Sequence, residues 1–296
     1  MKNWKRNTFL LTAVLLAMSG SGYYALSDSG EPTLAQQAAG VRVDMPLDAY
    51  RLTPQQQLEV DRAADLLVRA CMAKAGFEWY IPAEPPRRVD PRRRRYGVID
   101  PQVAQEWGYH LPVDPASTDT ASRRSAVLKD PRADRAYYGP EDDKAKGCAA
   151  KAHAELAHGA GNARDIAFPR ATTLSWQSLE ASKKQRDVVA ALRAWKKCMA
   201  ARGHPYDTPA EAVSDKAWDL DAAAVGRQEK AVAVADVTCK YEVGLVTTWW
   251  EAESAVQRGM ISANAAALTA QKSMFETYME NVRAVLDRAR SSPADG

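Results

Sequence analysis

Residues 71–79 read CMAKAGFEW and residues 198–206 read CMAARGHPY, so the motif Cys-Met-Ala-x-x-Gly-x-x-aromatic occurs twice in the chain. Each copy closes a stretch whose apolar residues recur every three or four positions, the period of a helix with one buried face. The first stretch opens at Thr53, and Gln56 completes a capping box three residues later. The glycine of each motif stands where helices commonly end in a left-handed residue. The motif therefore predicts two long helices with equivalent ends.

The four cysteines could pair in three ways. Each motif cysteine, Cys71 or Cys198, is followed downstream by one further cysteine, Cys148 or Cys239, on a helical stretch. If a motif helix and its partner helix form a repeated unit, the disulfides are Cys71–Cys148 and Cys198–Cys239. The chain is then an all-α, disulfide-stapled helical bundle of two related units. The alternative is a chance likeness between two Ala-rich helix ends.

This division predicts the domain organisation. A signal peptide or N-terminal anchor covers 1–27, a linker 28–52, the first helical unit 53–160, a connector 161–178, the second helical unit 179–290 and a disordered tail 291–296. Apolar stripes between Val232 and Leu286 predict a long C-terminal helix in the second unit. Because the stripe shifts by one residue near Gly259, the helix is either continuous and bent there or restarts at Ser262.

The N-terminus predicts export. Lys2, Lys5 and Arg6 precede an uncharged apolar run, and small residues follow it, as in a secretory signal. Cleavage after Ser27 is favoured, although the uncharged stretch is near the length of a membrane span, so a retained anchor stays open. No cysteine precedes Cys71, which excludes lipid attachment through a cysteine near the signal. Outside the cytoplasm thiols are normally oxidised, in agreement with two disulfides.

A polar insertion at 80–138 separates the cysteines of the first unit. Its eight prolines predict that it holds no long helix. Six arginines lie within nine residues, which indicates either a solvated loop or contact with an anionic envelope polymer or lipid headgroup. Aromatic residues beside the arginines suggest that part of the segment packs on the helices. The candidate binding residues are Arg92, Arg93, Arg94, Arg95, Tyr96, Trp107, Tyr109 and His110.

Catalytic and metal motifs are largely missing. His153 and His158 are five residues apart, about 140° around a helix, so they do not share a face as zinc-binding histidines do. We expect no metal site, no cofactor and no catalytic residue. The net charge of +3 in 296 residues gives no reason to expect a nucleic-acid partner. An exported hydrolase that uses His110 or His204 as a base remains the alternative, and redox sensing through the cysteines is a weaker one.

An ordered set of residues resembles a family of exported actinobacterial helical proteins of the secreted or lipoprotein-like kind. The likeness lies in Cys71-Met72 through Trp79, Tyr96-Gly97-Val98, Gly108-Tyr109-His110, Gly139, Gly147-Cys148, Trp195-x-x-Cys198-Met199, Gly203, Pro209 and Ala233 to Cys239. The resemblance implies an α-helical extracytoplasmic domain with two disulfides and no assigned activity. It also implies that the protein is encoded near export-type ABC transporters and peptidoglycan-binding adaptors.

Together, these observations predict an exported, non-enzymatic cell-envelope binding or accessory protein. Its expected partner is an envelope protein, such as an ABC-type export system, or an anionic wall polymer. Contact with the membrane is expected only through the N-terminal segment.

Overall fold

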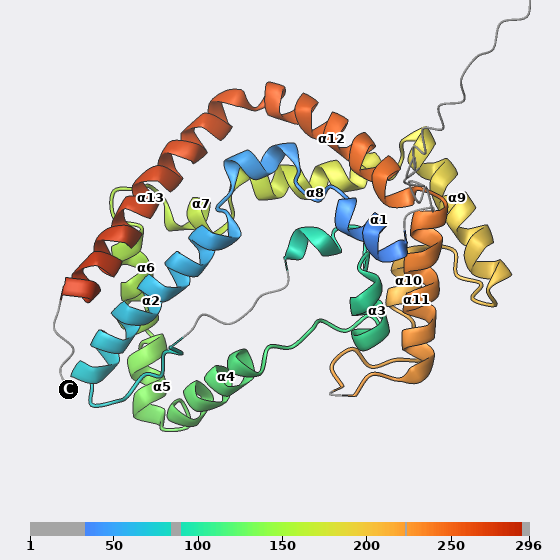
Figure 1. The fold of residues 1–296 in the computed structure, drawn as a ribbon. Helices are drawn as coiled ribbons and strands as arrows, with labels where there is room; N and C mark the ends of the chain where they lie inside the picture. Colours follow the sequence, from blue (N-terminus) through green and yellow to red (C-terminus); the bar gives the residue numbers. More distant parts are fainter. Residues whose placement is uncertain (1–32, 84–89, 223, 292–296) are drawn as a thin grey trace, which may run out of the picture. The chain divides into compact units, whose positions relative to one another are not determined.

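The computed structural model describes residues 33–83, 90–222 and 224–291, and these are all-α, with no β-strand (Figure 1). The helices are α1 (Leu34–Gly40), η1 (Pro46–Tyr50), α2 (Pro54–Lys74), η2 (Pro91–Arg94), α3 (Pro101–Trp107), α4 (Pro115–Val127), α5 (Pro131–Tyr138), η3 (Lys144–Lys146), α6 (Cys148–Leu156), α7 (Ala163–Ala167), α8 (Arg170–Ser182), α9 (Arg186–Ala201), α10 (Pro209–Val213), α11 (Arg227–Glu242), α12 (Leu245–Ala263) and α13 (Ala265–Ser291). The predicted all-α class is confirmed.

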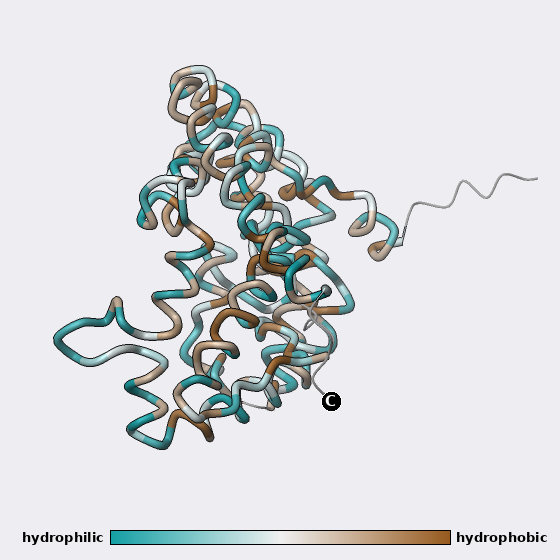
Figure 2. The backbone as a smooth tube through the Cα atoms, turned by 90° about the vertical axis from the view of Figure 1, so that its left-hand side faces the viewer, coloured by the Kyte–Doolittle hydropathy of each residue, from teal (hydrophilic) through white to brown (hydrophobic). Residues whose placement is uncertain are grey.

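The helices bury their apolar faces in several clusters. In Figure 2 apolar and polar positions alternate along the helical turns, as expected when one face of a helix is buried. One cluster joins α9, α11 and α12 to residues of the insertion, including Tyr96 and Tyr109. A second lies between α2 and α13, and a third between α2, α5 and α6. α8 packs against α12, and this contact places the candidate site.

The repeated motif forms the same helix end twice. In α2, Gly76 has a φ of +84°, and the Met72 carbonyl accepts a hydrogen bond from the Phe77 N–H at 3.0 Å. In α9, Gly203 has a φ of +79°, and the Met199 carbonyl accepts from the His204 N–H at 2.9 Å. This is the Schellman arrangement, which needs a residue free to adopt positive φ. Both methionines are fully buried, so each motif also anchors its helix in a core.

Both predicted disulfides are present, Cys71–Cys148 and Cys198–Cys239. They indicate an oxidising environment. The first joins the last turn of α2 to the first residue of α6, whereas the second joins the last turns of α9 and α11. The partner helix is therefore attached at its N-terminal end in one case and its C-terminal end in the other. The likeness of the two units is limited to the motif helices.

The prediction that the insertion holds no long helix is wrong, because α4 has 13 residues and α3 and α5 accompany it. The prolines start these helices instead of preventing them. Asp-Pro occurs at 90–91, 100–101, 114–115 and 130–131, and each aspartate accepts a hydrogen bond from an N–H of the first turn. Proline in the first turn loses no helical hydrogen bond, and an aspartate N-cap satisfies a free N–H.

The C-terminal part is divided more often than expected. The long C-terminal helix is α13, with 27 residues, and its start after Asn264 lies close to the predicted restart at Ser262. A second break, between α11 and α12, was not predicted. Gly244 lies there with a φ of +65°, a conformation that glycine adopts without strain.

Segments predicted as connections also carry structure. Within 28–52, α1 and η1 form, and Leu47 is fully buried. Within 161–178 lie α7 and most of α8. No helix among the described residues combines the length and the apolar content needed to cross a membrane. The predicted signal or anchor at 1–27, Arg87, Arg88 and most of the predicted tail lie outside the described residues.

Candidate functional site

The predicted binding residues lie on a segment, residues 90–110, that folds against α11 and α12. Three buried carboxylates on these helices, Glu229 and Asp236 on α11 and Glu253 on α12, each accept hydrogen bonds from it. A buried carboxylate is costly unless donors or a cation compensate for its lost hydration. The segment supplies donors to all three, which explains why a charged, proline-containing stretch has a defined position.

Glu253 is the most heavily bonded of the three. The Arg95 guanidinium forms an ion pair with it, and the Tyr96 hydroxyl donates to it at 2.9 Å. The Ser178 hydroxyl of α8 donates at 2.7 Å, and the Gln257 amide of α12 at 3.1 Å. Burial and the neighbouring carboxylate raise the pKa of Tyr96, so it stays a donor. Glu253 thus joins α8, α12 and the 90–110 segment.

Asp236 lies at the centre of a second network. The Lys240 ammonium of the same helix is 2.9 Å away, and both side chains are fully buried. The Trp195 indole donates to Asp236 at 2.9 Å and the Tyr109 hydroxyl at 3.4 Å. Burial raises the pKa of Asp236, and Lys240 opposes that rise. Lys240 also donates to the Val98 carbonyl at 2.9 Å, which fixes the segment to α11.

The third buried carboxylate, Glu229, contacts the His110 ring. The His110 Nδ1 lies 2.9 Å from Glu229 Oε1, and the Tyr109 N–H donates to the same oxygen at 2.8 Å. His110 Nε2 and Glu229 Oε2 are buried and have no partner among the described residues. A histidine oriented by a carboxylate is the geometry of a general base. His110 is only 6% exposed, however, so its ring is not open to a substrate in this arrangement.

A pocket of about 270 Å³, which we call the arginine pocket, adjoins the hydrogen-bonded group around Glu253. It is lined by Met45, Asp48, Arg51, Pro91, Arg92, Arg94, Arg95, Thr172, Ser175, Trp176 and Leu179. Three predicted binding residues, Arg92, Arg94 and Arg95, are therefore brought together at one cavity. The cavity forms where η1 and η2 meet α8.

Three of the four arginines in this pocket have carboxylate partners. Arg51 lies 3.6 Å from Asp48, Arg92 lies 2.6 Å from Asp90, and Arg95 pairs with Glu253. Arg94 is different: it donates to the Tyr109 and His110 carbonyls at 2.8 and 2.5 Å, and no carboxylate among the described residues pairs with it. Burial lowers the pKa of Arg94, but an arginine remains charged in proteins. Arg94 is therefore the one arginine of this pocket that has no carboxylate ion-pair partner among the described residues.

The other predicted binding residues do not line the pocket. Arg93 donates to the Ala38 carbonyl at 3.1 Å and so holds α1. Trp107 is half-buried at the end of α3. Tyr96, Tyr109 and His110 are buried and bind the carboxylates described above. The interpretation of 92–95 as a solvated loop is wrong, because these arginines form η2 and its C-cap and bond to the helical body.

The sequence analysis did not predict the buried carboxylates that accept hydrogen bonds from residues 90–110. Asp236 is fully buried, whereas a charged residue on a helix is usually exposed. A signal was present, because Asp236 and Lys240 are four residues apart within the stripe that contains Val232 and Cys239. The pocket residues of η1 and α8 were missed as well, because their proximity to the arginines depends on the tertiary fold.

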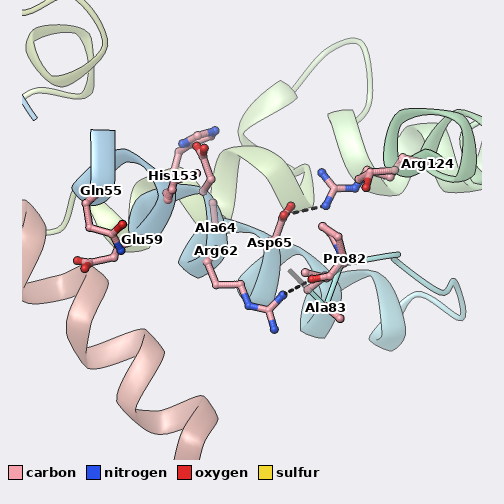
Figure 3. Close-up of a pocket in the computed structure, with 13 residues that line it drawn as sticks. Gln55, Glu59, Arg62, Ala64, Asp65, Pro82, Ala83, Arg124 and His153 are labelled. Atoms are coloured by element: carbon pink, nitrogen blue, oxygen red, sulfur yellow. Dashed lines mark hydrogen bonds and ion pairs between the residues drawn. The ribbon is translucent and has the colours of Figure 1, made fainter. Parts of the chain in front are cut away.

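A second pocket, of about 510 Å³, lies between α2, α4, α6 and residues 81–83 (Figure 3). Its charged side chains are largely engaged in fold contacts. Arg124 pairs with Asp65 at 2.7 Å, and Arg62 donates to the Pro82 carbonyl at 3.0 Å. Three acids, Glu59, Asp61 and Asp65, line this pocket beside the two arginines, so its lining does not favour an anion.

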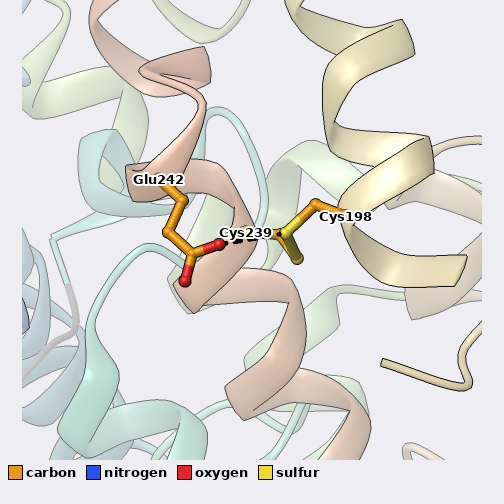
Figure 4. A group of neighbouring side chains, drawn as sticks. All are labelled: Cys198, Cys239 and Glu242. Carbon is orange, nitrogen blue, oxygen red and sulfur yellow. Dashed lines mark hydrogen bonds between the residues drawn. A yellow bond between two sulfur atoms is a disulfide. The ribbon is translucent and has the colours of Figure 1, made fainter. Parts of the chain in front are cut away.

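The sulfur atoms of Cys198 and Cys239 lie close to the Glu242 carboxylate (Figure 4). Cys, Cys and Glu are metal-binding residue types, but here both sulfurs are engaged in the disulfide, and a metal needs the thiolate. Arg202 pairs with Glu242 and contacts the Cys198 sulfur at 2.9 Å. Arg202 and Glu242 therefore form an ion pair that lies against the Cys198–Cys239 disulfide.

Comparisons with protein-family models, with curated proteins and with solved structures found no match for this chain.

Proposed function

We propose that the chain is an exported, non-enzymatic cell-envelope protein that binds an anionic polymer through the arginine pocket. The N-terminal sequence and the two disulfides support the compartment. Polymers that meet an exported protein in the envelope commonly carry phosphate or carboxylate groups. Arginine binds both with paired N–H donors in a fixed plane.

The observation that carries the proposal is Arg94, an arginine without a carboxylate ion-pair partner among the described residues, in a pocket with three further arginines. Arg51, Arg92 and Arg95 are held by carboxylates, which limits their freedom before any ligand arrives. A preorganised site loses less conformational entropy on binding. The hydrolase alternative is weaker, because His110 is buried and no side chain among the described residues forms a hydrogen bond with the His204 ring.

Replacing Arg94 by glutamine is expected to weaken binding of poly(glycerol phosphate) roughly tenfold at low salt, because one charge-assisted contact is lost. Binding to the native protein is expected to weaken as salt rises to about 0.5 M, because ions screen the attraction. Isothermal titration calorimetry with the full, oxidised chain measures both. Arg186→Gln is the control, since this arginine has a side chain that is 95% exposed, outside the pocket.

Arg94 also holds two carbonyls, so its variant needs a check of folding by circular dichroism. Arg51→Gln provides a second test, because its ion pair with Asp48 is long and partly exposed. Unchanged affinity in both folded variants, or equal losses in Arg186→Gln, would contradict binding at the arginine pocket.

A further inference from the structure

Trp176 gives the arginine pocket an apolar wall that is open to solvent. The residue lies on α8 and is 62% exposed, although its neighbours Ser175 and Leu179 are buried. Among the described residues, none stacks on its ring or accepts a hydrogen bond from its indole N–H. An exposed indole at the rim of a polar cavity has a flat face free for a ligand and a donor at its edge.

The charge balance of the pocket limits the anionic group that it fits. One arginine, Arg94, has no carboxylate ion-pair partner among the described residues, whereas the other three have one. A phosphodiester carries a single negative charge and matches Arg94, whereas a phosphate monoester carries nearly two. The arginines reach the cavity from two segments, since Arg51 follows η1 and the others belong to η2 and its C-cap. Donors arriving from different directions suit the tetrahedral oxygens of phosphate better than a planar carboxylate.

The flat indole face suits a sugar ring. Sugars present one face of C–H groups, which pack on an aromatic ring, while their hydroxyls bond to polar groups beside it. Thr172, one helical turn before Trp176, also lines the pocket and has a hydroxyl. The cavity therefore combines a phosphodiester site with an adjoining platform for a sugar.

We infer that the ligand of the arginine pocket is a glycosylated polyol phosphate, with the phosphodiester at Arg94 and the sugar on Trp176. The inference rests on the proposed function and names the ligand class of the same site. Trp176 is then the residue that distinguishes a glycosylated from an unsubstituted polymer.

The test compares two polymers that differ only in the sugar: poly(glycerol phosphate) with and without glucosyl groups. By calorimetry with the full, oxidised chain, the glucosylated polymer is expected to bind roughly five- to tenfold more tightly, since aromatic packing provides such a gain. Trp176→Ala is expected to abolish this difference between the two polymers. Phe168→Ala is the control, because this aromatic side chain is 73% exposed just before α8 and does not line the pocket.

Three results would overturn the inference. The first is equal binding of both polymers to the native chain, and the second is a preference that survives in Trp176→Ala. The third is tighter binding of polygalacturonate, a carboxylate polymer. If the chain binds both polymers and the glucosyl groups do not change the affinity, this inference is wrong but the proposed function stands. Failure of all three polymers to bind removes both.

Discussion

The Glu253→Ala variant is expected to unfold with a free energy lower by about 3–5 kcal/mol than the native chain, because breaking a buried ion pair leaves its partner uncompensated. Arg95 would lose its carboxylate, and Tyr96 and Ser178 would lose their acceptor. Chemical denaturation followed by circular dichroism measures the loss. Trypsin adds a local measurement, since cleavage after Arg92 to Arg95 should become faster when the segment is released from α12.

The control for this variant is Glu251→Ala. Glu251 lies two residues earlier on α12 and is exposed, so the same change of residue type should cost less than about 0.5 kcal/mol. If Glu253→Ala is no more destabilising than Glu251→Ala, or if trypsin cleaves 92–95 no faster, Glu253 does not hold the segment.

Lys240→Met is expected to be similarly destabilising, by about 3–5 kcal/mol near neutral pH, because Asp236 would be left as an unpaired buried charge. The effect should depend on pH in a definite direction. Burial already raises the pKa of Asp236 above its ordinary value of 3.8, and loss of Lys240 removes an opposing influence. A carboxyl group with a raised folded-state pKa stabilises the fold at low pH, and this stabilisation is lost as pH rises through that pKa.

The variant should therefore be less impaired at about pH 5 than at about pH 8, relative to the native chain at each pH. Denaturation at both values tests this, with Lys230→Met as the control because Lys230 is half-exposed on the same helix. A loss that is equal at both values, or larger at the lower one, would contradict the assignment of a buried Asp236–Lys240 pair.

The features predicted correctly from the sequence are those specified by a few neighbouring residues. Thr53 and Gln56 form the expected capping box, and Gly76 and Gly203 end their helices with positive φ. The disulfide pairing was also correct, although the two partner helices are attached at opposite ends. Local hydrogen bonding decides helix ends, so short sequence signals predict them well.

The errors have two physical causes. Prolines were interpreted as helix breakers, but Pro101, Pro115 and Pro131 each follow an aspartate and begin a helix, where proline has no cost. The burial of Asp236 and Glu253 was not predicted, because charged side chains are usually exposed. Lys240, four residues from Asp236, is a partner that the sequence pattern could have indicated. Other donors, such as Tyr109 and Tyr96, are more than 120 positions away in the chain, so no local pattern indicates them.

The candidate site was predicted in part. The sequence predicted Arg92 to Arg95 as binding residues. Three of them, Arg92, Arg94 and Arg95, line the arginine pocket. Arg93 instead bonds to α1, and Arg95 also forms the ion pair with Glu253. Two further lining residues, Arg51 and Trp176, lie before and after the 80–138 insertion in the sequence. Only the tertiary structure places them beside the arginines.

We propose that this chain recognises an anionic polymer of the cell wall. Sedimentation of the full, oxidised protein with purified walls that carry a polyol-phosphate polymer tests it most directly, with the same walls after mild acid has removed the polymer as the comparison. We predict that the protein sediments with the intact walls and stays in solution with the stripped ones. Equal sedimentation with both preparations, or none with either, would contradict the claim.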